Sequence, residues 1–172
     1  MLKPIAVICD LYITVIRGIP VVVLLLIFYF IIFASSDNGV MVAIITFGIN
    51  SGAYMAELIR GGIQAVDKGQ MEAGRSLGLS KLQTMYKIIF PQAVRYILPS
   101  IGNEMIALLK ETSVAGYVAV RDITKAGDQV RNITYDAVNP LTTVALTYLG
   151  MVVILTALLN MLEKRLAKSD KG

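Results

Sequence analysis

The chain has 172 residues, of which 56% are hydrophobic and 16% charged, with a net charge of +4 and a mean hydropathy of +0.69. Soluble domains are nearer to about 45–50% apolar and about 25% charged, so this composition excludes an ordinary soluble domain and indicates a helical membrane protein. The chain has no histidine and one cysteine, Cys9, which excludes a disulfide framework and the usual His/Cys metal sites.

Residues 1–16 are mildly apolar and are interrupted by Lys3 and Asp10, so they predict a helix at the membrane interface or the end of one. An early proline and an acid where a small-residue cleavage site would lie do not fit a cleavable signal peptide. Arg17 follows, and we expect a solvated cytoplasmic charge there, with contact to lipid phosphate as the alternative.

Four stretches are expected to cross the bilayer: residues 18–34, 40–59, 88–109 and 141–162. A transmembrane helix needs about 20 mostly apolar residues; the last stretch meets this best, the first is short, and prolines and charges interrupt the third. Basic residues crowd the segment between the second and third stretches, whereas the turn at 35–39 has none. The positive-inside rule therefore places that segment and both chain ends, with the basic residues at 164–171, in the cytoplasm and residues 110–139 outside.

The segment between the second and third stretches predicts two short helices and a sharp corner. Residues 71–77 are mostly good helix formers, and Gly78 lies where a helix end favours a left-handed residue. Ser80 and Gln83 form a capping-box pattern, so a second helix is expected from about Lys81. It should stop or kink just before the proline that ends the segment.

This segment resembles the cytoplasmic EAA loop of ABC importer permeases, written EAA-x3-G-x9-I-x-L-P. The matching residues are Glu72, Ala73, Gly74, Gly78, Ile88, Phe90 and Pro91. Glycine replaces the second alanine and phenylalanine replaces the leucine. In that family the loop is a coupling helix that docks in a cleft of the ATP-binding subunit. The resemblance implies this role for Glu72, Ala73, Gly74 and Gly78, within a coupling loop at about residues 66–91; the alternative is an ordinary loop that happens to match.

The resemblance extends over essentially the whole chain, to permeases for polar amino acids of the histidine, arginine and glutamine type. Residues 17–20 are similar to their RGTP segment and residues 50–63 to their NSAAYxAExxRGGI stretch. It implies an all-α, type I (MetI-like) permease fold, with about four transmembrane helices plus cytoplasmic coupling helices in a single domain over 1–172, in the bacterial inner membrane. Members usually have five spans, so we expect an N-terminally shortened member or a fragment.

The resemblance also implies a transport subunit that is not an enzyme and binds no cofactor or metal itself. A separate ATP-binding subunit would hydrolyse Mg-ATP, and an extracytoplasmic binding protein would deliver the amino acid. A second permease copy or a related permease would complete the pore within the lipid bilayer, and no nucleic acid is involved. The sequence leaves open which amino acid is carried and whether the pore is a homodimer.

Polar residues within the expected spans form a second candidate site. Asn50, Tyr54 and Glu57 have i, i+4, i+7 spacing and share one helix face. Asn103 and Glu104 lie deep in the third stretch, where an ionisable group normally faces a cavity or a partner. Together they predict a substrate pathway in which Asn103 and Glu104 hold the ammonium or the cationic side chain of the amino acid.

Structural readings of these polar residues remain open. Glu104 is alternatively an ion-pair partner of Arg95 or Lys110. Lys110 and Glu111 are expected at the outer rim, where they either contact an external binding protein or are solvated. Two other functions also remain: a stand-alone secondary carrier that uses Glu57 and Glu104 as proton or sodium sites, and a membrane fragment that does not transport.

Overall fold

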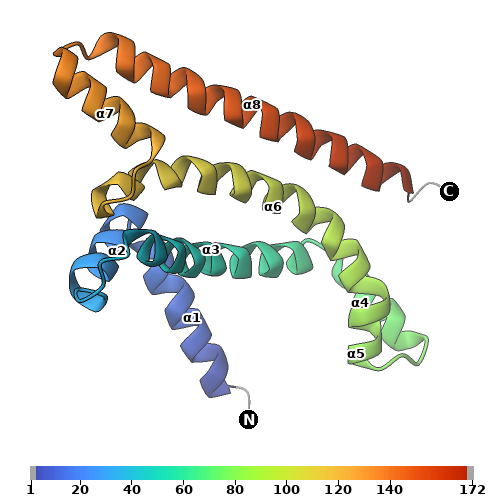
Figure 1. The fold of residues 1–172 in the computed structure, drawn as a ribbon. Coiled ribbons are helices and arrows are strands. Elements are labelled where there is room, and N and C mark those ends of the chain that lie inside the picture. The colour runs from blue at the N-terminus through green and yellow to red at the C-terminus, as the bar shows by residue number, and fades with distance from the viewer. Residues whose placement is uncertain (1–2, 170–172) are drawn as a thin grey trace.

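The computed structural model describes residues 3–169, and every element among them is helical (Figure 1). In chain order the elements are α1 (Lys3–Gly18), α2 (Val21–Ile27), η1 (Phe28–Ile32), α3 (Gly39–Gln64), α4 (Lys68–Ser76), α5 (Lys81–Thr84), η2 (Met85–Ile89), α6 (Phe90–Glu111), η3 (Thr112–Val118), α7 (Ile123–Thr134) and α8 (Val138–Ser169). Two of the short elements, η1 and η2, are π-helical, and η3 is a 3₁₀-helix. The basic cluster expected at 164–171 lies outside the side chains that the structure describes.

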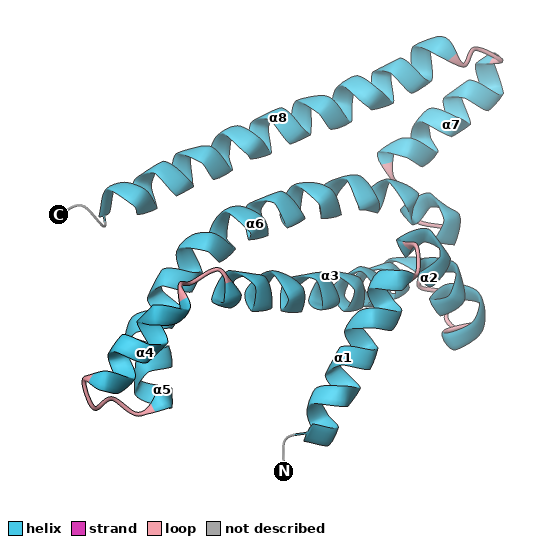
Figure 2. Ribbon diagram, turned by 180° about the vertical axis from the view of Figure 1, so that it is seen from behind, coloured by secondary structure: helices cyan, strands magenta, loops and turns pink. Residues whose placement is uncertain are grey.

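Helices α3 and α6 pack side by side and antiparallel at the centre of the fold (Figures 1 and 2). Near the start of α6, a Cβ on Gly62 would lie 2.2 Å from Cγ1 of Ile97, so only glycine allows this approach of the two helices. Helix α1 crosses α3, and the Tyr12 hydroxyl donates a hydrogen bond to the Ile49 carbonyl at 2.6 Å. The polar stretch of α3 is thereby contacted by α1 and α6.

Two apolar clusters hold the ends of the α3–α6 pair. At one end, Phe47 of α3 packs with Leu25 of α2 and Val118 of η3. At the other end, Val66 packs with Ile89 and Ala93, which joins the loop after α3 to the start of α6. Asn50, Tyr54 and Glu57, three of the residues predicted for the substrate pathway, lie between these two clusters along α3.

The two most apolar expected spans are confirmed as helices of sufficient length. Helix α3 and the part of α8 over Val138–Glu163 are long and apolar enough to cross a membrane, and α1 with α2–η1 forms a third candidate bent by 104°. The short first stretch is helical from Val21 to Ile32 as α2 and η1, and whether it crosses the bilayer stays a prediction. Helix α6 has 22 residues but does not meet the same test of apolarity, so the count of four spans stays a prediction.

The polar segment 110–139 is folded rather than an open loop. It forms η3 and α7, and α7 runs back beside the first turns of α8 (Figure 2). A Cβ on Gly127 would lie 2.4 Å from Cγ2 of Val144, so α7 and α8 make close contact there. The apolar window of α8 is itself not buried within this chain.

Candidate functional site

The corner between α4 and α5 has the geometry that the sequence predicts. Gly78 has a φ of +82°, which is left-handed and favours glycine. Its N–H donates to the Arg75 carbonyl at 3.0 Å, and the N–H of Leu79 donates to the Gly74 carbonyl at 3.1 Å. These two bonds are those of a Schellman motif, which satisfies the last carbonyls of α4 and fixes the direction in which the chain leaves it.

The predicted capping box is confirmed at the start of α5. The Ser80 hydroxyl accepts from the Gln83 N–H at 3.2 Å, and the Gln83 side chain accepts from the Ser80 N–H at 2.8 Å. Of the two outcomes expected just before Pro91, a stop is wrong, but the regular α-helix is interrupted there by the π-helical residues Met85–Ile89. The chain passes through the π-turn η2 and continues as α6, with Pro91 as the second residue of α6.

Close packing against Thr84 and Ile88 explains why this chain has Gly74 where the EAA pattern has alanine. Thr84 is fully buried and its Oγ1 donates to the Ser80 carbonyl at 3.0 Å. A Cβ on Gly74 would lie 2.5 Å from Cγ2 of Thr84 and 3.2 Å from Cδ1 of Ile88. Glycine therefore lets α4 rest directly on α5 and η2, and the two short helices form one compact unit.

We call residues 66–91 the knob. Its exposed surface is largely polar and charged but carries three large apolar side chains, Leu77, Leu82 and Tyr86, which are 81%, 72% and 73% exposed; Glu72 and Ala73 are exposed as well. Large exposed apolar side chains grouped with polar ones mark interaction surfaces. The opposite side of the knob is anchored, because Met71 and Met85 pack on the cluster that contains Ile89 and Ala93. Force on the exposed side would reach α3 and α6 through this cluster.

An open groove of about 650 Å³ lies at the base of the knob. The end of α3, the following loop, α4 and η2 line it, and its wall includes Met71, Glu72 and Ile89. Glu72 therefore lies at the edge of a concave surface rather than on an isolated helix face. The arrangement can receive a protruding side chain from another protein.

The predicted polar face of α3 is real, and it has partners that the sequence did not suggest. Asn50 is 2% exposed, and its Nδ2 donates to Oε2 of Glu111 at 3.2 Å. Glu111 was expected at the outer rim, either solvated or in contact with an external binding protein, but it is half-buried and bonded to α3 instead. The antiparallel packing of α3 and α6 produces this contact between residues 61 positions apart.

Arg17 joins the same face from α1. Its guanidinium lies over the Tyr54 ring, 5.1 Å from the centroid, and its Nη1 is 3.5 Å from Oε2 of Glu57. Glu57 also accepts a hydrogen bond from Arg60 at 2.7 Å. Arg17 is exposed, as expected for a solvated charge, but it also has partners on α3 that the sequence did not indicate; its cytoplasmic position stays a prediction.

Glu104 and Asn103 separate in the structure. Glu104 is half-buried and lies within electrostatic range of Arg17 and Glu111, whereas Asn103 is exposed. Seven residues are close to two helical turns, so Glu104 and Glu111 share one face of α6 and Asn103 is on another. That spacing is a signal in the sequence that could have linked Glu111 to Glu104. We call Arg17, Asn50, Tyr54, Glu57, Glu104 and Glu111 the polar lane.

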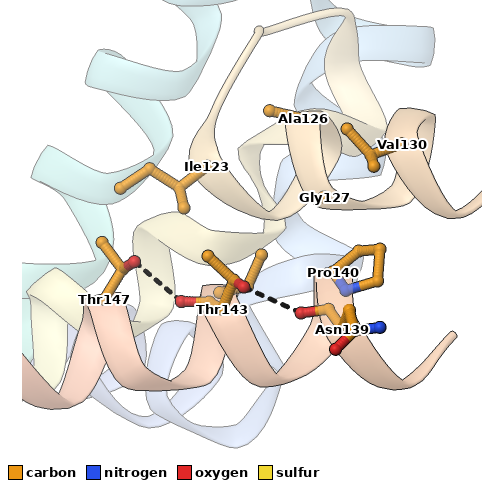
Figure 3. Close-up of a pocket in the computed structure, with 9 residues that line it drawn as sticks. Ile123, Ala126, Gly127, Val130, Asn139, Pro140, Thr143 and Thr147 are labelled. Carbon is orange, nitrogen blue, oxygen red and sulfur yellow. Dashed lines mark hydrogen bonds between the residues drawn. The ribbon is translucent and has the colours of Figure 1, made fainter.

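A cavity of about 370 Å³ between α7 and α8 is lined by few polar side chains (Figure 3). Its wall is mainly aliphatic, with Ile123, Val130 and Val144 among the lining residues. The hydroxyls of Thr143 and Thr147 donate to carbonyls one turn earlier, at 2.8 and 2.7 Å, so their protons are already used within α8. The knob and the polar lane are the stronger candidates for function.

This chain is similar in sequence to membrane components of transport systems. The family model described as "Binding-protein-dependent transport system inner membrane component" matches residues 3–168. The arginine transport system permease protein ArtQ of Bacillus subtilis is 35% identical over 171 residues, covering 98% of this chain and 78% of that protein. The glutamine transport system permease protein GlnP of Escherichia coli K12 is 37% identical over 159 residues, covering 90% and 73%.

A solved structure shows the same architecture. In the crystal structure of an amino acid ABC transporter with histidines, one chain superposes with a TM-score of 0.88 and 40% identity, over 95% of this chain and 77% of that one. The all-α permease fold implied by the sequence resemblance is thereby confirmed.

Proposed function

The chain belongs to the family of binding-protein-dependent transport system inner membrane components, and we propose that the knob couples its membrane helices to ATP-binding subunits during import of polar amino acids. Its relatives are permease subunits of amino acid transporters, and the chain is such a subunit rather than an enzyme. The observation that carries the coupling proposal is the knob, which exposes Leu77, Leu82 and Tyr86 while Met71 and Met85 fix it to the apolar cluster at the start of α6.

The coupling would be mechanical. An ATP-binding subunit would accept Leu77, Leu82 and Tyr86 in a cleft, and Glu72 would meet donors at its edge. The Schellman corner and the buried Gly74–Thr84 contact make the knob stiff, so closure of the ATP-binding subunits would move it as a rigid body. The attached ends of α3 and α6 would follow, and the pathway would open alternately to the outside and to the inside of the cell. Mg-ATP is bound and hydrolysed by the partner subunits.

The polar lane would form part of the substrate pathway. Carboxylates, an amide and a guanidinium within membrane helices are expensive unless they face a partner or a water-filled path. The lane offers both charges that an amino acid needs, carboxylates for the ammonium group and Arg17 for the carboxylate. A second permease copy or a related permease would close the path around this face. Asn103 stays a candidate for that neighbouring surface rather than for the lane.

The positive-inside pattern supports a cytoplasmic knob and C-terminus in the inner membrane. The opposite end, with η3 and α7, would then receive the amino acid from the extracytoplasmic binding protein. A carrier driven by proton or sodium gradients would need no knob with exposed apolar side chains, so the partner subunit distinguishes the two functions.

The test is purification of the chain from its own membrane in mild detergent, with mass spectrometry of the proteins that accompany it. We expect an ATP-binding subunit, lost when Leu82→Ser removes an exposed apolar contact. Ile133→Ser is the matched control, because Ile133 is 77% exposed but lies near the corner between α7 and α8.

Recovery of the ATP-binding subunit with wild type and Ile133→Ser, but not with Leu82→Ser, supports coupling through the knob. Equal recovery with both variants would contradict the knob as the docking surface. Recovery of the chain alone, under conditions that preserve other complexes of this kind, would favour the carrier or the fragment.

A further inference from the structure

A second cavity, of about 330 Å³, lies between η3, α7 and the start of α8, and charged side chains line much of it. Four charged side chains line it: Asp122, Lys125, Asp128 and Arg131. Ser113 of η3 and Leu141 of α8 complete the wall. Its two acids and two bases balance one another, so the cavity suits a ligand that carries both charges.

The cavity lies at a depth where lipid would normally be expected. Thr124, at the start of α7, is 3.4 Å from the Tyr148 hydroxyl of α8, and Gly127 lies against Val144. Tyr148 is seven residues inside the uncharged run that begins at 141, which is roughly 10 Å along the helix axis. Helix α7 is thus re-entrant beside the outer turns of α8, although its sequence is too polar to face hydrocarbon.

The two sides of α7 resolve this conflict. Ile123, Ala126 and Val130 lie on one side, along the aliphatic groove against α8 (Figure 3). Lys125, Asp128 and Arg131 lie on the other side, in the charged cavity. Charged groups at membrane depth face water or a partner, so the charged side faces a water-filled space and the aliphatic side faces lipid or a neighbouring helix.

One donor in the cavity has no acceptor. The Arg131 Nη2 donates to Oδ1 of Asp128 at 2.5 Å, and Lys125 Nζ is 3.9 Å from Oδ2 of the same carboxylate. The Nε of Arg131 is buried and makes no hydrogen bond to any described residue. A buried donor without an acceptor is unfavourable, and a guanidinium edge binds a carboxylate well because two N–H groups point the same way.

We propose that this cavity is the outer vestibule of the pathway and that Arg131 holds the α-carboxylate of the arriving amino acid there. The proposal rests on the proposed function for the identity of the ligand. The substrate carboxylate would take the place of Asp128 on Arg131, which would free Asp128 for the substrate ammonium. The expected class is therefore any α-amino acid with both groups free, before the polar lane selects among side chains.

Thiol labelling tests the vestibule without requiring transport. In the assembled transporter with Cys9→Ser, we would compare Ser113→Cys in the cavity with Ala126→Cys on the aliphatic side of α7. A membrane-impermeant thiol reagent added from outside should modify Ser113→Cys and not Ala126→Cys. Saturating substrate amino acid should slow the modification of Ser113→Cys several-fold. Equal labelling of both, or labelling that substrate does not slow, would overturn the proposal.

Uptake kinetics test the role of Arg131. Arg131→Lys keeps the charge but removes the Nε donor, and it should raise the substrate concentration for half-maximal uptake about tenfold without changing maximal ATP hydrolysis. Arg121→Lys is the matched control. Arg121 is exposed, and its Nη2 donates a long hydrogen bond of 3.5 Å to the Gln129 side chain. An unchanged half-maximal concentration would contradict the carboxylate site alone, whereas a wild-type complex without substrate-stimulated ATP hydrolysis would contradict the proposed function.

Discussion

The side-chain amide of Asn50 on α3 is 3.2 Å from the carboxylate of Glu111 on α6, and this bond joins the two central helices inside the polar lane. Asn50→Asp would place two carboxylates together and leave Glu111 without its donor. We expect a loss of about 1–3 kcal/mol in stability and reduced uptake, measured by thermal unfolding in detergent and by transport in vesicles.

The charge swap Asn50→Asp with Glu111→Gln is the control for that prediction. It restores one amide and one carboxylate with the donor on the other helix, so stability should return toward wild type. A double variant as unstable as the single one would show that the Asn50–Glu111 bond does not hold the helices together.

Arg17 combines stacking on Tyr54 with an ion pair to Glu57, and lysine cannot reproduce both. Arg17→Lys should therefore lose roughly 0.5–2 kcal/mol of cation–π stabilisation. In a double-mutant cycle with Tyr54→Leu, the two losses should be less than additive, whereas with Tyr54→Phe, which keeps the ring, Arg17→Lys should have its full effect. Full additivity with Tyr54→Leu would mean that the ring contact contributes nothing.

Gly74→Ala restores the family alanine but places a methyl group against buried Thr84. Overpacking costs about 1–3 kcal/mol, which outweighs the helix propensity gain of about 1 kcal/mol. We expect the variant to be less stable and less well coupled, as measured by thermal unfolding and by substrate-stimulated ATP hydrolysis. Thr84→Ala in the same chain should recover part of the loss, and a Gly74→Ala variant as stable as wild type would contradict the contact.

Asp136, in the turn between α7 and α8, has a pKa below its ordinary value because the Asn139 side chain and then the Val138 N–H donate to its carboxylate. Since the folded form holds the lower pKa, the stabilisation of the turn is present above the unfolded pKa of about 3.9. It is lost as pH falls through the folded value. Hydrogen exchange at Val138 should accelerate in that acidic window, and Asn139→Ala should move the window to higher pH. An exchange rate that follows only the intrinsic pH dependence would contradict this role.

The sequence predicted the local features of the knob because short-range chemistry determines them. The left-handed Gly78 and the Ser80–Gln83 capping box depend on neighbouring residues, and both are present. The reason for Gly74 could not be predicted, because the Thr84 contact depends on how two helices pack. Continuation through Pro91 was one of two predicted outcomes, but the π-turn that precedes it could not be read from the local pattern.

The polar lane shows a similar limit. Periodicity placed Asn50, Tyr54 and Glu57 on one face of α3, but it could not identify Arg17 and Glu111 as their neighbours. Those contacts require the bend after α1 and the register between α3 and α6, neither of which is encoded in a local pattern. The same holds for α7, whose polar composition suggested an external loop although the helix packs beside α8.

Substrate-stimulated ATP hydrolysis by the complex reconstituted with Glu72→Ala tests the central claim most directly. Glu72 is exposed at the edge of the knob groove, so the variant should fold and insert normally. The account predicts that substrate and binding protein no longer stimulate hydrolysis, while Asp37→Ala, an exposed acid in the turn before α3, keeps the stimulation. Wild-type stimulation in Glu72→Ala, with the complex intact, would contradict coupling through Glu72 of the knob.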